Sequence, residues 1–556
     1  MKLYSKLILA GCMTGMLASC NYLDFDESTN KTQEEVFSTF DNVRNAVAGV
    51  YTFLPQDFGA LGGAMREAAT DNASYVWDNN NVYKIYDNKW SPVNTVDDVW
   101  ANMYTGIQAA NSYLESYNED FLKRFSLNDG YDEEIAKFRM YPNEVRALRA
   151  FYFFELAKRY GDVPLVTKTL KLEEVNTLKR SPFQEVIDFI ATECSQVAEV
   201  LPVDHNSFWK ETGRVTKGMA LALKSRALLY AASELHNPGH DTELWKKAAE
   251  AAKEVMDMGK YSLPNIEKDP LYSKNGSHDV LKSAQMIFER RGYESDSYER
   301  TNLPIGFEGG NSGNTPTQNL VDAYEMANGE IFDWNNAKHV KEMYINEEGQ
   351  PVSRDPRFYK TVTYNGSILM GERVESLEGG KNGLPLVGAT ETGYYMRKYI
   401  NETMSLDPAH PITKNHHFIL FRYAEILLNY AEAMNEWVGA DVIPENFTLS
   451  ARDALNMVRV AANMPKVTVT GATFTERLRN ERRVELAFED HRFWDIRRWK
   501  KGSVVKDIYG VRLSSKGEYQ KVKVQTRVWE DKMYLYPVSQ QEIYKNPGLG
   551  QNIGWN

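Results

Sequence analysis

Apolar residues recur at spacings of three and four over much of the chain, which is typical of helices that bury one face. Between residues 98 and 118 these positions are Val99, Met103, Ile107, Ala110 and Leu114. The same period returns in Glu144 to Arg159, Met219 to Leu235, Leu244 to Met258, Ile419 to Trp437, Ser450 to Ala461 and Phe474 to Phe488. The sequence therefore predicts a mainly α-helical fold.

Some of these segments form pairs joined by turn residues. The clearest pair is Lys217 to Glu234 and Thr242 to Gly259, separated by His236-Asn237-Pro238-Gly239. The two helices can approach closely because the pair contains small residues, namely Ala227, Ala231, Ala248 and Ala252. We interpret the pair as a tetratricopeptide-like hairpin within a helical scaffold that covers mainly residues 98–260 and 416–500.

Helical periodicity fades between about 262 and 415, where Gly and Pro are frequent. The β-branched run from Lys360 to Tyr364 precedes Asn365-Gly366, a hairpin turn signal, and short strand-like runs return in the C-terminal segment 501–556. We expect a loop-rich, ligand-binding lobe with short β-strands from about 55–95 and 262–415, within a body that spans residues 36–556.

The N-terminus carries a lipoprotein signal. Lys2 and Lys6 precede an apolar run from Leu7 to Leu17, which is too short to span a bilayer, and Leu17-Ala18-Ser19 leads into Cys20. We expect residues 1–19 to be a signal peptide, Cys20 to be acylated, and residues 20–35 to be a tether that anchors the body to one leaflet of a membrane. The alternative is an ordinary signal peptide with a chance cysteine.

The composition favours a large folded protein without a nucleic-acid partner. The chain has 556 residues, is 42% hydrophobic and carries a net charge of −11, with no extended basic run. Beyond the signal, Cys194 is the only cysteine, and its place in an amphipathic segment predicts a buried, inert thiol.

Common catalytic signatures are missing from the sequence. There is no His-Glu-x-x-His, no Gly-x-Ser-x-Gly and no phosphate-binding Gly-x-x-x-x-Gly-Lys-Ser/Thr. We therefore expect no enzyme, no catalytic residues, no metal site and no cofactor. Paired carboxylates need only be close in space, so a surface glycoside hydrolase stays an alternative.

Aromatic and amide side chains cluster outside the predicted helices. The segment from Asp71 to Tyr83 holds Trp77 and three consecutive asparagines that end at Asn81, and Trp90 follows. Such groups suit the hydroxyls and the C–H face of a sugar. A second group combines Tyr293, Tyr298 and Phe307 with a glycine-rich loop at 309–313. The alternative is that the tryptophans are core residues and the asparagines form a turn.

The run from Asn480 to Trp499 is dense in charge. Glu481 and Glu485 share a helix face, and five arginines stand among aromatic residues. An anion site would fit these residues, but charges of alternating sign more often form a structural ion-pair network, which is our prediction.

The chain resembles the SusD/RagB family of outer-membrane nutrient-binding lipoproteins of Bacteroidetes. The resemblance rests on the signal end at Cys20, Arg146 to Val166, Arg354-Asp355-Pro356-Arg357-Phe358, Asn480 to Trp499, and the tail from Leu535-Tyr536-Pro537 to Asn552. It covers nearly the whole chain.

The resemblance implies a SusD-like fold with four tetratricopeptide-like hairpins and a loop-rich lobe. It also implies a non-catalytic, surface-exposed protein that captures an oligosaccharide or polysaccharide and acts as a lid on a SusC-like TonB-dependent transporter barrel. Regions that bind glycans in the family correspond here to segments with Asp71, Trp77, Asn81, Tyr83, Trp90, Tyr293 and Phe307. Some family members bind peptides, so a peptide-capturing lid is the alternative.

Overall fold

The computed structural model describes residues 33–205, 211–514 and 517–555. Helices account for 44% of the chain and strands for 11%, which confirms the prediction of a mainly α-helical fold with small sheets. The predicted signal peptide and the acylation site at Cys20 lie outside the described residues.

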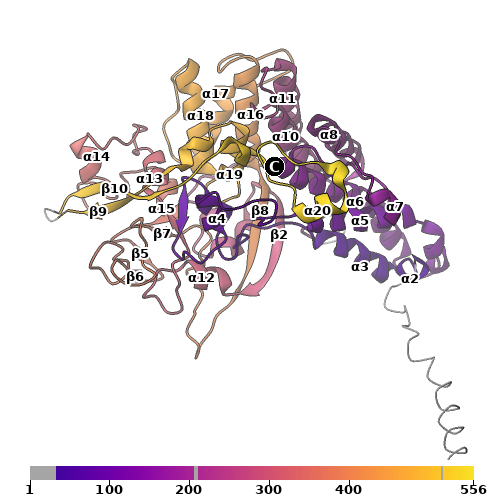
Figure 1. Cartoon of the computed structure of the whole chain (residues 1–556), viewed down its shortest axis with the longest axis horizontal. Coiled ribbons are helices and arrows are strands. Elements are labelled where there is room, and N and C mark those ends of the chain that lie inside the picture. The colour runs from indigo at the N-terminus through magenta and orange to yellow at the C-terminus, as the bar shows by residue number, and fades with distance from the viewer. Residues whose placement is uncertain (1–32, 206–210, 515–516, 556) are drawn as a thin grey trace, which may run out of the picture.

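Long helices stack side by side along one half of the molecule (Figure 1). They are α3 (Phe40–Tyr51), α5 (Trp100–Ser116), α6 (Tyr131–Tyr160), α8 (Phe183–Val200), α10 (Lys217–Ala232), α11 (Thr242–Asp257), α16 (Tyr423–Trp437), α17 (Ala451–Ala461) and α18 (Gly471–Glu485). Helix α6 packs on α5 and α8, α8 on α10, α10 on α11, and α11 on α16, which contacts α17 and α18. Among the described helices, none is both long and apolar enough to cross a membrane.

Local sequence signals set the ends of these helices. The Thr216 hydroxyl accepts a hydrogen bond from the Met219 amide at 3.3 Å and begins α10, and Ser450 and Asp453 form a reciprocal capping box at α17. Helix α6 ends at Gly161, whose φ of 72° suits glycine. The predicted pair Lys217–Glu234 and Thr242–Gly259 is confirmed as α10 and α11.

The helix predicted from Ile419 is wrong in its first residues. Residues Ile419 to Arg422 belong to strand β8 (Lys414–Arg422), which pairs with β2 (Met286–Ser295), and α16 begins at Tyr423. The residues from His416 to Arg422 are all buried, so this part of the strand lacks the alternation that identifies a half-buried strand. A fully buried strand and a buried helix look alike in such a run.

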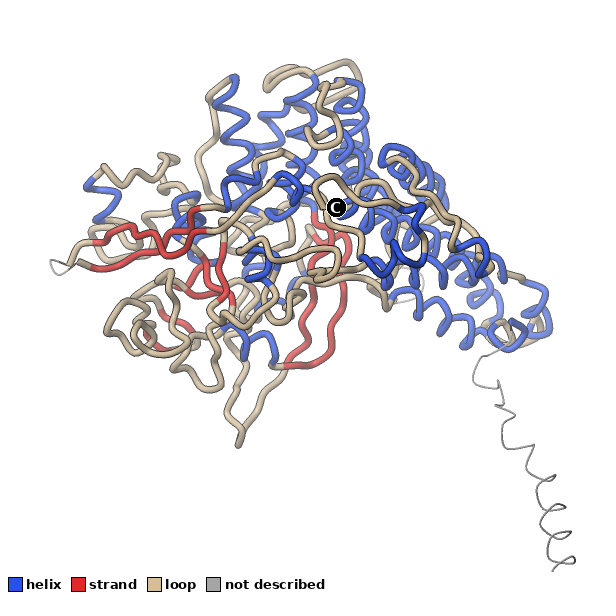
Figure 2. The backbone as a smooth tube through the Cα atoms, in the orientation of Figure 1, coloured by secondary structure: helices blue, strands red, loops and turns tan. Residues whose placement is uncertain are grey.

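The remaining strands are short and lie in the loop-rich half of the molecule (Figure 2). They are β1 (Ala73–Tyr75), β3 (Asn314–Pro316), β4 (Val362–Thr363), β5 (Ile368–Leu369), β6 (Glu372–Arg373), β7 (Tyr395–Met396), β9 (Asp507–Leu513) and β10 (Tyr519–Thr526). The antiparallel pairs are β1–β3, β2–β8, β4–β7, β5–β6 and β9–β10.

Short helices occupy the connections between these elements. They are α2 (Gln33–Val36), α4 (Val82–Tyr86), α7 (Leu172–Val175), α12 (Ser297–Asn302), α13 (Gln318–Ala323), α14 (Ala337–Lys341), α15 (Pro356–Thr361), α19 (Arg492–Arg498) and α20 (Gln540–Lys545). Two of them correct the sequence reading, since Lys360 and Thr361 belong to α15 and not to a strand, and Tyr83 is helical. A turn forms at Asn365-Gly366, with φ of 90° at Gly366, but it does not join a hairpin of its flanking strands, because β4 pairs with β7 and β5 with β6.

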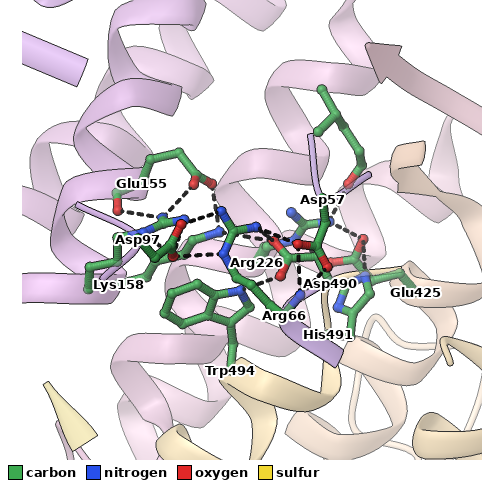
Figure 3. A network of polar contacts seen from close by, with 12 residues as sticks. Asp57, Arg66, Asp97, Glu155, Lys158, Arg226, Glu425, Asp490, His491 and Trp494 are labelled. Atoms are coloured by element: carbon green, nitrogen blue, oxygen red, sulfur yellow. Dashed lines mark hydrogen bonds and ion pairs between the residues drawn. The ribbon is translucent and has the colours of Figure 1, made fainter. Parts of the chain in front are cut away.

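A buried network of ion pairs fastens the early loops to the helical stack (Figure 3). The Arg66 guanidinium contacts Asp97 at 2.7 Å and Asp57 and Asp490 at 3.3 Å each. The network continues through Glu155 of α6, which pairs with neighbouring cations. Because every charge in it meets an opposite charge, the network fixes where the loops leave the scaffold.

The charged run near the C-terminus forms a structural network, as predicted. Glu481 and Glu485 both contact Arg357, and Arg482 pairs with Asp495 at 2.9 Å. All five side chains are buried. The guanidinium groups of Arg357 and Arg482 are therefore occupied by carboxylates of this chain and are not held open for an anion. Arg497 of the same run is buried against the Phe493 ring instead.

Close packing of α10, α11 and α16 depends on alanines. Ala252 of α11 is fully buried, as are Ala227 and Ala231 of α10. Ala252→Leu should overpack this contact and lower the free energy of unfolding by about 1–3 kcal/mol in urea titrations. Ala472→Leu, at an exposed position of α18, is the control and should change it by less than about 0.5 kcal/mol. Equal stability of the two variants would contradict this account of the contact.

Candidate ligand-binding surface

The three asparagines that follow Asp78 line an open hollow of about 740 Å³. We call it the asparagine hollow, and its wall consists of Gly62, Asp78, Asn79, Asn80, Asn81, Tyr83, Lys84, Asp87 and Lys89. Asn79 and Asn81 have exposed side chains. The wall thus presents amides, two carboxylates and two lysines around one aromatic ring.

Asn80 holds the loop in shape. Its side-chain nitrogen donates to the Gly62 carbonyl at 2.8 Å, and its side-chain oxygen accepts from the Val82 amide at 2.9 Å. Helix α4 then begins directly after Asn81. The fixed central asparagine leaves its two neighbours pointing to solvent, so their amide groups stay available.

Trp77 joins the two loop groups that the sequence singled out. Its indole nitrogen donates to the Asn311 carbonyl at 2.8 Å, and the preceding strand β1 pairs with β3 just after that glycine-rich loop. The ring is half-buried and lies close to Gly388, where a Cβ would be 2.9 Å from it. Trp77 does not line the asparagine hollow but directly precedes Asp78, which does.

Tyr83 lines the hollow, and its hydroxyl has a partner in the protein. The hydroxyl donates to the Tyr75 carbonyl at 2.9 Å, and the ring contacts Tyr86 with centroids 4.8 Å apart. Burial is the main cause that raises the pKa of Tyr83 above its usual range. The side chain is therefore a neutral, fixed platform.

Tyr293 and Phe307 lie outside the asparagine hollow. Tyr293 is 92% exposed near the end of β2 and lines a separate cavity of about 450 Å³ with Arg290 and Arg291. Phe307 is 7% exposed, and the Lys381 ammonium lies 5.8 Å from its ring centroid. The structure does not bring these two rings into one platform with the asparagines.

Two further candidates are interior residues, which corrects the prediction that they offer groups to a ligand. Trp90 is 1% exposed and packs edge to face on Tyr536 and Trp555. Asp71 is 4% exposed and receives Arg492 through two oxygens, each at 2.9 Å. Trp90 is therefore packed against two aromatic rings and Asp71 is paired with a guanidinium group, so neither side chain is available to a ligand.

The electrostatics of Asp71 fit a structural role. Burial alone would raise its pKa, but the guanidinium groups of Arg483 and Arg492 lower the pKa to about 2.

Cys194 agrees with the prediction of a buried, inert thiol, because it is fully buried and burial raises its pKa well above the usual range.

Sequence reasoning missed most of the charged part of the hollow. Asp78 lies inside the predicted segment from Asp71 to Tyr83, whereas Lys84 and Asp87 lie just beyond its end. Their helical spacing would have placed them on the same side had α4 been recognised. Gly62 is distant in sequence, and no local signal connects it to the asparagines.

A hollow lined by amides and carboxylates can hydrogen-bond a ligand rich in hydroxyl groups, because amides donate and accept while carboxylates accept. Within the described ranges, no group of three or more metal-ligating side chains gathers. A stack of helices that carries such a surface on its loops is the architecture of a ligand-binding protein.

Comparison with known families agrees with this class. A family model described as "SusD family" matches residues 283–555, and one described as "Starch-binding associating with outer membrane" matches residues 21–229. This chain belongs to the SusD family.

Relatives match over almost their whole length. A SusD-like protein of Formosa agariphila is 23% identical over 97% of this chain and 96% of its own. A solved SusD-like protein of Bacteroides fragilis is 28% identical, with a TM-score of 0.76 over 95% of this chain and 99% of that one. A solved SusD-like carbohydrate-binding protein of the same species is 25% identical, with a TM-score of 0.72 over 93% and 100%.

Proposed function

We propose that this protein binds a glycan at the asparagine hollow and performs no chemistry on it. The observation that carries the proposal is the hollow itself, where the exposed amides of Asn79 and Asn81 stand beside two carboxylates and the ring of Tyr83. Amides and carboxylates match sugar hydroxyls, and an aromatic ring matches the C–H face of a pyranose. The carbohydrate-binding description of the Bacteroides fragilis relative supports this ligand class.

The place of the protein in the cell follows from the N-terminal sequence and the family. We propose that Cys20 carries acyl chains that anchor the protein to the outer membrane, with the body exposed at the cell surface. The family description that mentions the outer membrane supports this location. The protein would then serve as the lid of a SusC-like TonB-dependent transporter and pass the captured glycan to it.

The test compares variants of the two exposed asparagines in affinity gels that contain plant, host or microbial polysaccharides. Asn79→Ala combined with Asn81→Ala should weaken binding of the retarding polymer about tenfold, because hydrogen bonds to the ligand are lost while the fold is untouched. Asn128→Ala, at an exposed turn before α6, is the matched control and should bind as the wild type does.

Other outcomes would overturn the proposal in distinct ways. Wild-type protein that is retarded by no polymer but binds a peptide digest would favour peptide capture. Equal retardation of the double variant and the control would remove the asparagine hollow as the site. Release of short sugars from a polymer during incubation would show a hydrolase, for which the hollow holds the carboxylates Asp78 and Asp87.

A further inference from the structure

A second cavity, of about 690 Å³, lies in the loop-rich lobe and shares no lining residue with the asparagine hollow. Its wall draws on the segment around Lys274, helix α15, the turn before β5, strand β6 and the start of β10. Its volume is typical of sites that enclose a small molecule or a short oligomer. We call it the basic cavity.

The basic cavity concentrates positive charge in an acidic protein. Six of its lining residues are cations, namely Lys274, Lys341, Lys360, Arg373, Arg397 and Lys398, and Glu402 is its one acidic lining residue. The whole chain has a net charge of −11, so this local excess is opposite in sign to the rest of the molecule. Such a pocket attracts anions by its field.

Two of these cations are free to meet a ligand. Lys274 and Arg373 are exposed and form no ion pair with any described residue. Lys341 and Lys360 reach only exposed carboxylates, each at 3.4 Å. The free guanidinium of Arg373 can grip a carboxylate or sulfate with two parallel hydrogen bonds.

The other two cations are held by the protein. Arg397 pairs with Glu402 at 2.6 Å and donates to the Ile368 carbonyl at 2.9 Å. Lys398 is buried against Glu489 at 2.5 Å. Arg397 and Lys398 thus stiffen the wall of the cavity. The backbone amide of Glu402 also donates to the carbonyl of Lys274 at 2.8 Å, which connects the segment of the free lysine to the loop that holds Glu402.

Tyrosines supply the apolar part of the wall. The rings of Tyr344 and Tyr364 stack with centroids 4.7 Å apart, and Tyr519 stands edge-on to Tyr344 at 5.1 Å. Tyr359 donates from its hydroxyl to the Tyr344 carbonyl at 3.0 Å, so the cluster is fixed. Tyr344 and Tyr364 are buried and support the wall, whereas Tyr359 and Tyr519 are half-buried and offer ring surface. Such rings beside free cations suit a ligand that has both a flat C–H face and negative charge.

The backbone conformation around the basic cavity leaves space for its cations and rings. Gly366, at φ of 90°, makes the turn before β5, and a Cβ there would lie 3.3 Å from the Arg373 guanidinium. Tyr399, another lining residue, has a φ of 68°, which is uncommon for a bulky residue. Strained residues of this kind are enriched at ligand sites.

We infer that the basic cavity is a second binding site, separate from the asparagine hollow, for an anionic oligosaccharide that carries carboxylate or sulfate groups. Arg373 and Lys274 hold the acidic groups, and the half-buried rings of Tyr359 and Tyr519 contact the sugar rings. The combination of tyrosines with isolated free cations favours a charged sugar over an acidic peptide, because the wall offers Arg373 and Lys274 as separate anchors between rings.

The inference is tested by calorimetry on the full chain in a detergent without a sugar headgroup. The probes are hexagalacturonate, its methyl-esterified and therefore uncharged form, a sulfated galactan oligosaccharide, and poly-glutamate. We expect an acidic oligosaccharide to bind at least about tenfold more tightly than its uncharged form, and this preference to shrink between 50 and 300 mM salt.

Two double variants that each remove two positive charges distinguish binding in the basic cavity from attraction by the overall charge of the protein. Lys274→Gln combined with Arg373→Gln should weaken binding of the acidic oligosaccharide about tenfold or more. Lys247→Gln combined with Lys506→Gln removes the same charge from exposed positions outside the cavity and should change the affinity less than about twofold.

The inference fails if acid and methyl ester bind equally, if both double variants behave alike, if poly-glutamate alone binds, or if no acidic oligosaccharide binds. Its failure is distinct from failure of the proposed function. A neutral polysaccharide that still binds, and loses binding with Asn79→Ala and Asn81→Ala, would keep the asparagine hollow while the basic cavity is abandoned. Loss of acidic binding in the Lys274 and Arg373 variant alone would support the basic cavity whatever the hollow does.

Discussion

Replacing Arg422 by methionine is expected to lower the free energy of unfolding by about 3–5 kcal/mol, since it breaks a buried ion-pair network from one side. Arg422 is 1% exposed and contacts Glu489 at 2.6 Å and Glu485 at 2.7 Å. It also donates to the carbonyl of Glu485 at 2.7 Å, which joins strand β8 to the end of α18. Urea unfolding followed by circular dichroism measures the loss.

The expected loss arises from the two carboxylates that stay buried. After Arg422→Met, Glu489 keeps only Lys398 and Glu485 keeps Arg357, so each loses a strong partner. Adding Glu489→Gln should recover part of the stability because one buried charge is removed. Arg44→Met is the control, since the Arg44 side chain is 43% exposed and its ion pairs contribute less than about 1 kcal/mol. A loss below that value for Arg422→Met would refute the argument.

Acidification is expected to cost several kcal/mol of stability between about pH 4.5 and pH 2. Four carboxyl groups have their pKa lowered to about 2, and they are Asp71, Glu155, Glu432 and Glu485. Burial alone would raise each pKa, but neighbouring cations, such as Lys158 and Arg159 beside Glu155, outweigh it.

The sign follows from the direction of these shifts. A carboxyl group with a lowered pKa in the folded state stabilises the fold above the pKa of the unfolded chain, and this contribution disappears as the pH falls through the folded pKa. For Glu155, Glu432 or Glu485 the full contribution is about 3 kcal/mol. Urea midpoints at pH 7, 5, 4 and 3 measure the fall. A midpoint that is unchanged from pH 5 to pH 3 would be incompatible with these ion pairs.

Glu67 acts with the opposite sign. Burial raises its pKa to about 7, although Asn72 donates a hydrogen bond to it at 2.6 Å. Its contribution to stability is therefore present below the unfolded pKa and is lost as the pH rises through 7. Glu67→Gln should remove that part of the pH dependence between 5 and 8 and leave the fall below pH 4.5 intact. A variant with an unchanged profile from pH 5 to pH 8 would exclude Glu67 as its source.

Helix periodicity made much of the scaffold predictable. It failed where a strand is buried on both faces or a helix is too short to show a helical period. The pair α10 and α11 was predictable because both helices have small contact residues and a cap, and α11 has its own apolar face, although α10 is buried on nearly all sides. The first residues expected of α16 were assigned wrongly because Ile419 to Arg422 are buried on both faces of a strand. Helix α4 was missed since it has five residues, which is too few for a helical period.

The candidate site was predictable only in part. Three asparagines in a row mark a loop, and the structure places them around a hollow. Trp90 carried the same local signal as Trp77, yet it meets Tyr536 and Trp555 from the far end of the chain. No local pattern near Trp90 contains that contact, so its burial could not be foreseen.

What the sequence by itself determined is local: helix faces, caps, turns, and the structural role of the charged run near Glu485. What only the tertiary structure decided is which side chains meet. Asp71 became a buried partner of Arg492, and Lys274 came to share a cavity with Arg373. The physical reason is that burial and charge pairing depend on residues hundreds of positions apart, whereas periodicity and capping act within a few residues.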